Sequence, residues 1–180
     1  MMTKAEFERR QRETAELFAR ARIVITPQER ERIEIADFGL DRYEDTGLGI
    51  LTYVNTDRVC AKELALLTGQ TCPEHRHPAV QGRPGKEETF RCRWGTVYLC
   101  VPGAPSAHPL GRAPAGREKA YTVRHEVVLR PGDQYTLMPD TLHWFQGGPE
   151  GAVISEFSTR STDEADVFSD PDIKRAPEVK

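Results

Sequence analysis

The sequence predicts an all-β fold: an antiparallel β-barrel or sandwich with a helical extension at its N-terminus. After Gly47 the chain breaks into short strand-like runs separated by turn residues, with no helical pattern between them. Eight such runs fall within residues 49–159, a density typical of antiparallel barrels and sandwiches. The whole chain has 180 residues, which suffices for one domain with a substantial core.

The N-terminal extension, residues 1–45, is expected to be helical and to pack on the barrel. Apolar side chains recur at helical spacing within residues 3–22 among strongly charged neighbours, which predicts a helix on the outside of the fold. The next stretch, TPQERERIEIADFGLD, is read as a short helix or an irregular segment. Thr26 would cap it, with Pro27 in its first turn.

The barrel is expected to span residues 46–160. Its predicted strands are GILTYVN, VCAKELALLTG, TCPEHRHP, EETFRCRWGTVYLCVPG, AYTVRHEVVLRPGD, QYTLMPD, LHWFQGG and GAVISEFST. Residues 104–120 are rich in Pro, Gly and Ala, which predicts a long exposed loop. The acidic residues 161–180 are expected to cover part of the barrel mouth and then to be loosely held.

Composition argues against several classes of protein. The net charge is −3 and no basic stripe is present, so no nucleic acid partner is expected. No apolar run approaches the ~20 residues of a membrane span, so no membrane partner is expected either. The N-terminus lacks the apolar core of a signal peptide, which favours the cytoplasm. The four cysteines form no CxxC pair and are expected to be reduced packing residues.

Histidines and a carboxylate on neighbouring predicted strands indicate a metal site. Residues two apart on a strand face the same side, so His75 and His77 project together. On the next strand, Glu88 is expected to share one face with Phe90, Cys92 and Trp94, a carboxylate at the mouth of an apolar row. Such a group is costly to bury unless it is paired or bound to a cation.

A third histidine, His143, follows the run RPGDQYTLMP. Three histidines and one carboxylate suit a first-row divalent ion that keeps positions open for substrate oxygens. The alternative is a set of ordinary core or surface histidines, but the shared strand faces and the density of ligand types favour a site. His108 and His125 have no companion ligands and are left out of it.

The stretch GQTCPEHRH followed by ETFRCRWG resembles the first cupin motif. The matching positions are Gly69, His75, His77, Glu88 and Gly95. Ten residues separate His77 from Glu88, more than the motif has, which indicates an inserted loop. RPGDQYTLMPDTLH resembles the second motif, with Pro139 and His143 one residue closer together and the final Asn absent. The fold that this resemblance implies is a jelly-roll-like antiparallel β-barrel.

HRHP with GKEETFRCRWG, then PGDQYTLMPDTLHWFQGG and ISEFSTRSTDEADVFSDP, closely resembles the D-lyxose isomerase family of cupins over most of residues 60–173. The resemblance implies a manganese-dependent aldose-ketose isomerase for D-lyxose and D-xylulose, with D-mannose and D-fructose as a related pair. Other divalent first-row metals are possible. In that family the metal ligands fall on His75, His77, Glu88 and His143. Cupins are commonly dimers, so a homodimer is expected.

Isomerisation also needs a base, and Glu156 is the candidate. In GAVISEFST it shares a face with Ala152 and Ile154, and apolar surroundings favour a carboxyl group that can take up a proton. A structural ion pair is the alternative. Lys86 would point into the same cavity and could bond a sugar oxygen or share in proton transfer, or it could be a solvated loop lysine.

Three residues of the C-terminal segment, Asp166, Phe168 and Asp170, are candidate sugar contacts, with an acidic surface tail as the alternative. Two other functions stay open. Three histidines and a glutamate also hold Fe(II) in cupin dioxygenases. A metal-stabilised barrel that binds sugar without turnover is the non-enzymatic reading.

Overall fold

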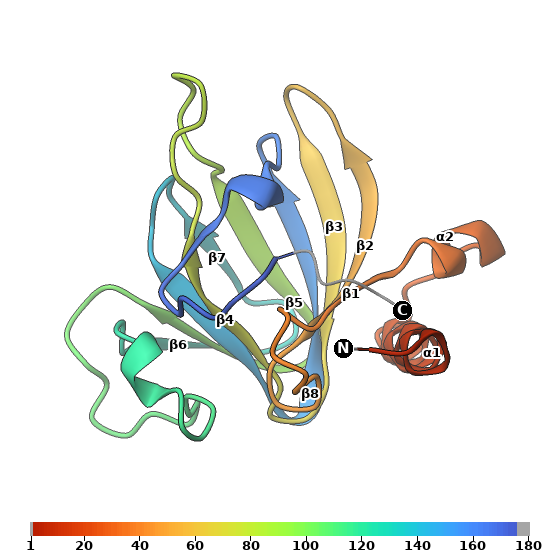
Figure 1. Ribbon diagram of the computed structural model, residues 1–180, viewed down its shortest axis with the longest axis horizontal. Coiled ribbons are helices and arrows are strands. Elements are labelled where there is room, and N and C mark those ends of the chain that lie inside the picture. Colours follow the sequence, from red (N-terminus) through yellow and green to blue (C-terminus); the bar gives the residue numbers. More distant parts are fainter. Residues whose placement is uncertain (1, 176–180) are drawn as a thin grey trace.

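One antiparallel β-sheet curls into a half-barrel and forms the body of the molecule (Figure 1). The structure is a computed structural model that describes residues 2–175. The strands are β1 (Glu34–Ala36), β2 (Leu48–Asn55), β3 (Cys60–Leu66), β4 (Thr71–Arg76), β5 (Glu88–Val101), β6 (His125–Leu129), β7 (Gln134–Leu137), β8 (His143–Ser158) and β9 (Val167–Phe168). Helices α1 (Lys4–Arg20) and α2 (Pro27–Glu31) precede them. The predicted all-β class with an N-terminal helical extension is confirmed.

Strand β8 runs through the middle of the sheet. Strand β5 pairs with it on one side, from Glu88 opposite Ser158 to Cys100 opposite Trp144. On the other side, β3 pairs with its second half and β4 with its first half. The sequence predicts two strands here, LHWFQGG and GAVISEFST, and that division is wrong. They form one strand of 16 residues. Its register against β5 shifts between Gly95 and Val97, and Gly151 adopts there a φ of +84°, which glycine tolerates without strain.

The inward face of the half-barrel holds the main hydrophobic core. Leu64, Phe90 and Ile154, from β3, β5 and β8, are buried there. Full burial of such a side chain contributes about 1.5–3 kcal/mol. Towards one end of these three strands the inward positions carry charge instead, at Lys62, Glu88 and Glu156. The alternation of the strands therefore places buried charged groups next to an apolar core.

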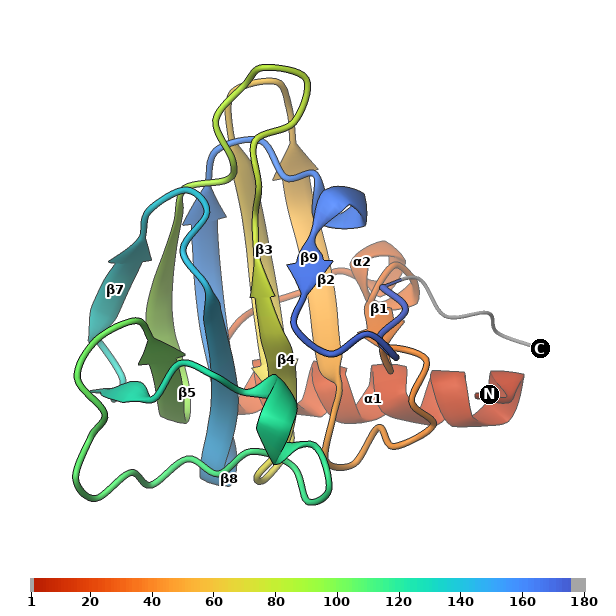
Figure 2. The same ribbon diagram turned by 60° about the vertical axis from the view of Figure 1, so that its left-hand side comes forward.

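Helix α1 packs against the outer face of the sheet, as predicted (Figure 2). Its Phe18 is buried against a second apolar cluster that includes Leu51 and Val153. Gly49 lies directly under the helix, where a Cβ would come within 2.3 Å of Thr14 Oγ1. The close approach of helix and sheet therefore depends on a residue without a side chain.

The short helix α2 begins as the sequence predicts. The Thr26 side chain accepts a hydrogen bond from the Glu29 N–H, and Pro27 occupies the first turn. The stretch that follows adds the short strand β1, which pairs with β2. No helix in the described part of the chain has the length and apolar character that a membrane span requires.

Trp94 lies on the outer side of the sheet, and the expectation that it shares a face with Glu88, Phe90 and Cys92 is wrong. The register between β5 and β8 shifts between Cys92 and Trp94. This β-bulge turns the later residues of β5 to the opposite face. Trp94 therefore packs with the α1 cluster, and its ring lies 5.8 Å from the Arg20 guanidinium.

Glu74 of β4 anchors two later segments of the chain to the half-barrel. The loop between β5 and β6, where the exposed insert was predicted, is held by the Thr122 backbone N–H and hydroxyl, which donate to Glu74 at 2.6 and 2.8 Å. Residues 161–175, here called the C-terminal strap, are held by the Ser169 hydroxyl at 2.7 Å. Residues 161–180 were predicted to be loosely held at their end, and the last of them, 176–180, lie outside the described residues. The domain boundaries at 45/46 and 160/161 stay predictions.

Candidate functional site

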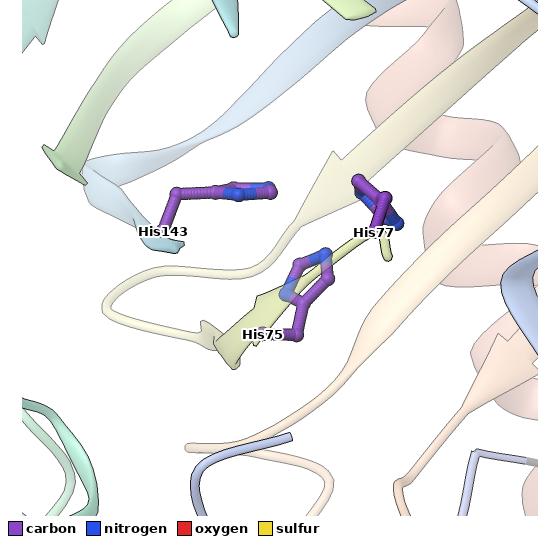
Figure 3. Close-up of side chains that lie close together, drawn as sticks. All are labelled: His75, His77 and His143. Carbon is purple, nitrogen blue, oxygen red and sulfur yellow. The ribbon is translucent and has the colours of Figure 1, made fainter. Parts of the chain in front are cut away.

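Three histidines meet at the charged end of the half-barrel (Figure 3). His75 lies in β4, His77 follows that strand directly, and His143 begins β8 opposite His75. All three are buried, and one ring nitrogen of each lies within 4.8 Å of the others. The pairing of β4 with β8 thus places His75 opposite His143, which lies almost 70 positions later in the chain.

Each imidazole has its Nδ1 engaged by an acceptor. His75 donates from Nδ1 to the Pro73 carbonyl at 2.7 Å, and His143 does the same to the Thr141 carbonyl at 2.9 Å. Nδ1 of His77 lies 2.5 Å from a carboxylate oxygen of Asp166. With Nδ1 used as a donor, Nε2 of each ring is the nitrogen left to act as a ligand.

Glu88, the first residue of β5, faces these nitrogens. Its Oε1 lies 3.0 Å from His77 Nε2 and 3.1 Å from His143 Nε2. Nε2 of His143 is buried and has no hydrogen-bond partner. In the tautomer that donates from Nδ1 to the Thr141 carbonyl, His143 turns the lone pair of Nε2 towards the Glu88 carboxylate oxygen. A divalent cation would satisfy both atoms, so the residues present fit a metal ion.

The charge states of these groups follow from their surroundings. Burial opposes the charged form of Glu88, but Lys86 and His77 outweigh it and hold the pKa of this carboxyl well below its usual range. Burial, together with His143 and His77, holds the pKa of His75 well below its usual value. Glu88 is therefore ionised and His75 neutral, the forms in which both bind metals.

His77 differs from the other two rings. Burial opposes its protonation, but Glu88 and Asp166 outweigh burial and raise the pKa of His77 to about 9. Without a cation, the His77 ring is therefore protonated on both nitrogens and positively charged at neutral pH. A metal ion that binds Nε2 must displace that proton.

Lys86 and Glu156 lie beside the histidines and contact each other. Both are buried, and Lys86 Nζ lies 3.1 Å from Glu156 Oε1 and 2.8 Å from Glu88 Oε2. The Ser158 hydroxyl donates to the same Glu156 oxygen at 3.2 Å. The sequence places Glu156 in apolar surroundings, and that expectation is wrong, because β3 and the segment before β5 each bring an ammonium group to it.

Lys62 and Asp163 are site residues that sequence reasoning missed. Lys62 Nζ lies 2.6 Å from Asp163 Oδ2, 2.9 Å from the Ser161 hydroxyl and 3.9 Å from Glu156 Oε1. Lys62 could have been found, because it alternates with apolar Cys60 and Leu64 on the inward face of β3. Asp163 could not, since it reaches the site on a 3-10 turn beyond the sheet.

The C-terminal strap contributes two of its three predicted residues to the cavity that these side chains line. Asp166 lies against His77, and the Phe168 ring lies 5.5 Å from that of His75. Asp170 is placed elsewhere: its carboxylate pairs with Arg117 at 2.8 Å and does not line the cavity. Apolar side chains complete the lining of the cavity: Phe38, Leu48, Ile50 and Phe145.

Solved structures with the same fold include L-ribose isomerases. The enzyme from Cellulomonas parahominis superposes with a TM-score of 0.80 at 20% identity, covering 99% of this chain and 98% of that one. The enzyme from Acinetobacter sp. DL28, in complex with L-ribose, has a TM-score of 0.79 at 20% identity over 96% of this chain and 94% of that one. At this level of identity the likeness shows the fold alone.

Sequence relatives identify the family. The family model described as D-lyxose isomerase matches residues 108–180. A D-lyxose/D-mannose isomerase of Thermosediminibacter oceani is 58% identical over 100% of this chain and 99% of its own. A D-lyxose ketol-isomerase of Cohnella laeviribosi is 58% identical over 92% of this chain and 91% of its own. Identity this high over nearly the full length shows that the chain belongs to the D-lyxose isomerase family.

Proposed function

We propose that this protein is an aldose-ketose isomerase that interconverts D-lyxose and D-xylulose with the help of a bound divalent cation. Its relatives named for the lyxose reaction, at 52% to 58% identity, support the activity. The observation that carries the proposal is the position of Lys86, whose ammonium group contacts both Glu88 and Glu156. Glu88, a candidate metal ligand, and Glu156, the candidate base, thus both contact the Lys86 ammonium group. One small substrate could reach all three groups.

We propose Mn²⁺ as the cation, held by His75, His77, His143 and Glu88, with other first-row divalent ions able to replace it. Three imidazoles and a carboxylate form a donor set that suits these ions. A bound cation would polarise the sugar carbonyl and stabilise the negative charge that develops on its oxygen.

Glu156 acts as the base in this proposal. Its carboxylate takes the proton from C2 of the open-chain aldose, which leaves an enediolate with its negative charge on O1. The hydroxyl proton then passes from O2 to O1, and Glu156 returns its proton to C1 to form the ketose. Burial opposes the charged form of Lys86, but Glu156, Glu88 and Asp163 outweigh it and raise the pKa of this amine well above its usual range. Lys86 therefore stays an ammonium group and acts as a hydrogen-bond donor to a sugar oxygen rather than as a base.

D-Mannose and D-fructose form the second proposed substrate pair. D-Mannose has the same configuration as D-lyxose at C2 and C3, the carbons nearest the reaction. The relative from Thermosediminibacter oceani is named for both sugars. A site that selects on these carbons would accept both aldoses, and the longer one would need room only at its far end.

We propose a homodimer in the cytoplasm as the working form. All four cysteines are buried and unpaired, which fits a compartment that keeps thiols reduced. The homodimer is proposed because dimers are common among cupins. A measurement of the molar mass in solution tests it.

The decisive experiment is an assay with added Mn²⁺ on a panel of pentoses and hexoses in deuterated water. We expect conversion of D-lyxose to D-xylulose, with solvent deuterium entering the product at C1 because the base exchanges its proton. Retention of all carbon-bound hydrogen would contradict the proton-transfer route and indicate a hydride shift. Oxygen consumption without isomerisation would indicate a dioxygenase, and sugar binding without turnover would indicate a binding protein.

A further inference from the structure

His77 is the one histidine of the site whose Nδ1 depends on a distant part of the chain. His75 and His143 each donate to a carbonyl two residues earlier, so neighbouring backbone fixes these two rings. His77 lies beyond the end of β4, and its Nδ1 contacts Asp166, 89 positions later in the chain. Its orientation therefore depends on the C-terminal strap.

The contact between these two side chains is short and protected from water. Asp166 Oδ1 lies 2.5 Å from His77 Nδ1, and the side chains are 6% and 7% exposed. A charged acceptor at this distance forms a strong hydrogen bond, and low exposure limits competition from water. The other ring nitrogen of His77 then points at Glu88.

The strap holds Asp166 in place from both sides. After it, β9 pairs with β4, with Phe168 opposite His75. The Ser169 N–H donates to the Glu74 carbonyl at 3.0 Å, and its hydroxyl donates to the Glu74 carboxylate at 2.7 Å. Before it, Asp163 pairs with Lys62. The carboxylate of Asp166 is therefore presented to His77 by backbone that is itself anchored.

We propose that Asp166 is a positioning residue of the cation site: its carboxylate holds His77 so that Nε2 faces the ion, and the sugar is not its partner. This proposal rests on the cation site of the proposed function. It assigns to Asp166 a role other than the sugar contact predicted from sequence. Carboxylate partners of metal-binding histidines fix the tautomer and the ring orientation, which is the geometry seen here.

The test is the affinity for Mn²⁺, measured by competition titration without sugar. We expect Asp166→Asn, which keeps an acceptor but loses the charge, and Asp166→Ala to weaken Mn²⁺ binding by about 10-fold to 100-fold, with the larger effect in the alanine variant. At saturating Mn²⁺, the KM for D-lyxose should stay close to the native value. Unchanged Mn²⁺ affinity with a raised KM would overturn the proposal and make Asp166 a sugar contact.

Two variants of the same strap serve as controls. Ser169→Ala removes one tie between strap and β4 without touching His77, and Asp172→Asn alters an exposed carboxylate that pairs with Arg117. Both should bind Mn²⁺ as the native protein does, because the pairing of β9 with β4 and the bond from the Ser169 N–H to the Glu74 carbonyl still anchor the strap in Ser169→Ala. An equal loss of affinity in Ser169→Ala would show that any loosening of the strap suffices, which overturns the specific role of Asp166.

A second readout is independent of turnover. In the metal-free protein, the Nδ1 proton of His77 should give a downfield NMR signal typical of a short hydrogen bond to a carboxylate. This signal should persist in Asp172→Asn and move upfield in Asp166→Asn. Its absence from the native protein would overturn the proposal, and a native protein that binds no Mn²⁺ would overturn the cation site as well.

Discussion

Glu156, the proposed base, lies between two buried ammonium groups that would determine how it works. Lys86 and Lys62 lie 3.1 and 3.9 Å from the same carboxylate oxygen. Burial opposes the charged form of Lys62, but Glu156 and Asp163 raise the pKa of this amine above its usual value. Both lysines therefore stay charged. They hold Glu156 in place before a proton arrives and can stabilise negative charge on the substrate afterwards.

The variant Glu156→Gln should separate catalysis from metal binding. The amide keeps the size of the side chain but cannot take up a proton, so kcat should fall by about 10²-fold to 10⁴-fold. Mn²⁺ content and affinity should stay native, because Glu156 is not a proposed ligand. Glu87→Gln, the same change at an exposed neighbour of Glu88, is the control and should retain full activity. Native turnover in Glu156→Gln would show that another group is the base.

The affinity for Mn²⁺ should rise with pH. The pKa of His77 is raised to about 9 in the metal-free protein. Below that pH the ion must displace a proton, so each unit of acidification should weaken binding by up to about tenfold. Glu88 and His75 add little over this range, because their pKa values are lowered and both groups are already deprotonated. Competition titrations between about pH 6.5 and 8.5 measure the slope, and a flat profile would contradict a protonated His77.

At the scale of elements, the alternation of strand residues predicted most of the site. His75, His77 and Glu88 project inward because strands have a period of two. The alternation rule failed after Cys92, because a β-bulge that has no signal in the sequence turns Trp94 to the opposite face of the sheet. It failed differently at β8, where glycine and proline indicated a turn but the strand continues.

Gly85 lets the inserted loop approach the site closely. A Cβ there would come within 1.8 Å of the His77 carbonyl oxygen, a backbone atom that cannot move aside. Gly85→Ala should therefore displace the loop from His77, weaken Mn²⁺ binding and lower the free energy of unfolding by about 1–3 kcal/mol. Titration and urea denaturation measure the two effects.

The matched control lies in the same loop. Gly82 has a φ of +75° and open space around it, so Gly82→Ala costs only backbone strain of about 1–2 kcal/mol. Its Mn²⁺ affinity should stay native. If both alanine variants lost affinity equally, the close contact at Gly85 would not be the cause.

At the scale of the whole molecule, a bound cation should stabilise the fold, because its ligands come from strands far apart in the chain. At a concentration about 100 times Kd, binding adds about 2.7 kcal/mol, which corresponds to a rise in Tm of about 5–10 °C. Thermal unfolding with and without Mn²⁺ measures it. Ca²⁺, which prefers more oxygen ligands, is the control and should raise Tm far less. An equal rise in a His143→Ala variant would place the ion elsewhere.

The sequence contains the fold class and the metal-ligand candidates, because both depend on local period and on motifs. The sequence does not show which side chains contact the metal-ligand candidates and their neighbours in the folded chain. Asp163 and Asp166 reach the site on a segment without a regular pattern, and only the folded chain shows that they contact Lys62 and His77. Asp170 was predicted to contact the sugar together with Asp166, yet it pairs with Arg117. Long-range pairing of this kind has no local signal.

The C-terminal strap has a consequence for biosynthesis. Asp163, the carboxylate nearest to the Lys62 ammonium group, is translated after every strand except β9. A ribosome must therefore finish almost the entire polypeptide before Lys62 meets it. Products of premature termination keep the Lys62 ammonium group in the barrel interior with Glu156, 3.9 Å away, but without Asp163, and the loss of a buried ion-pair partner lowers stability. Such fragments should be degraded quickly by cellular proteases, so that only full-length copies accumulate.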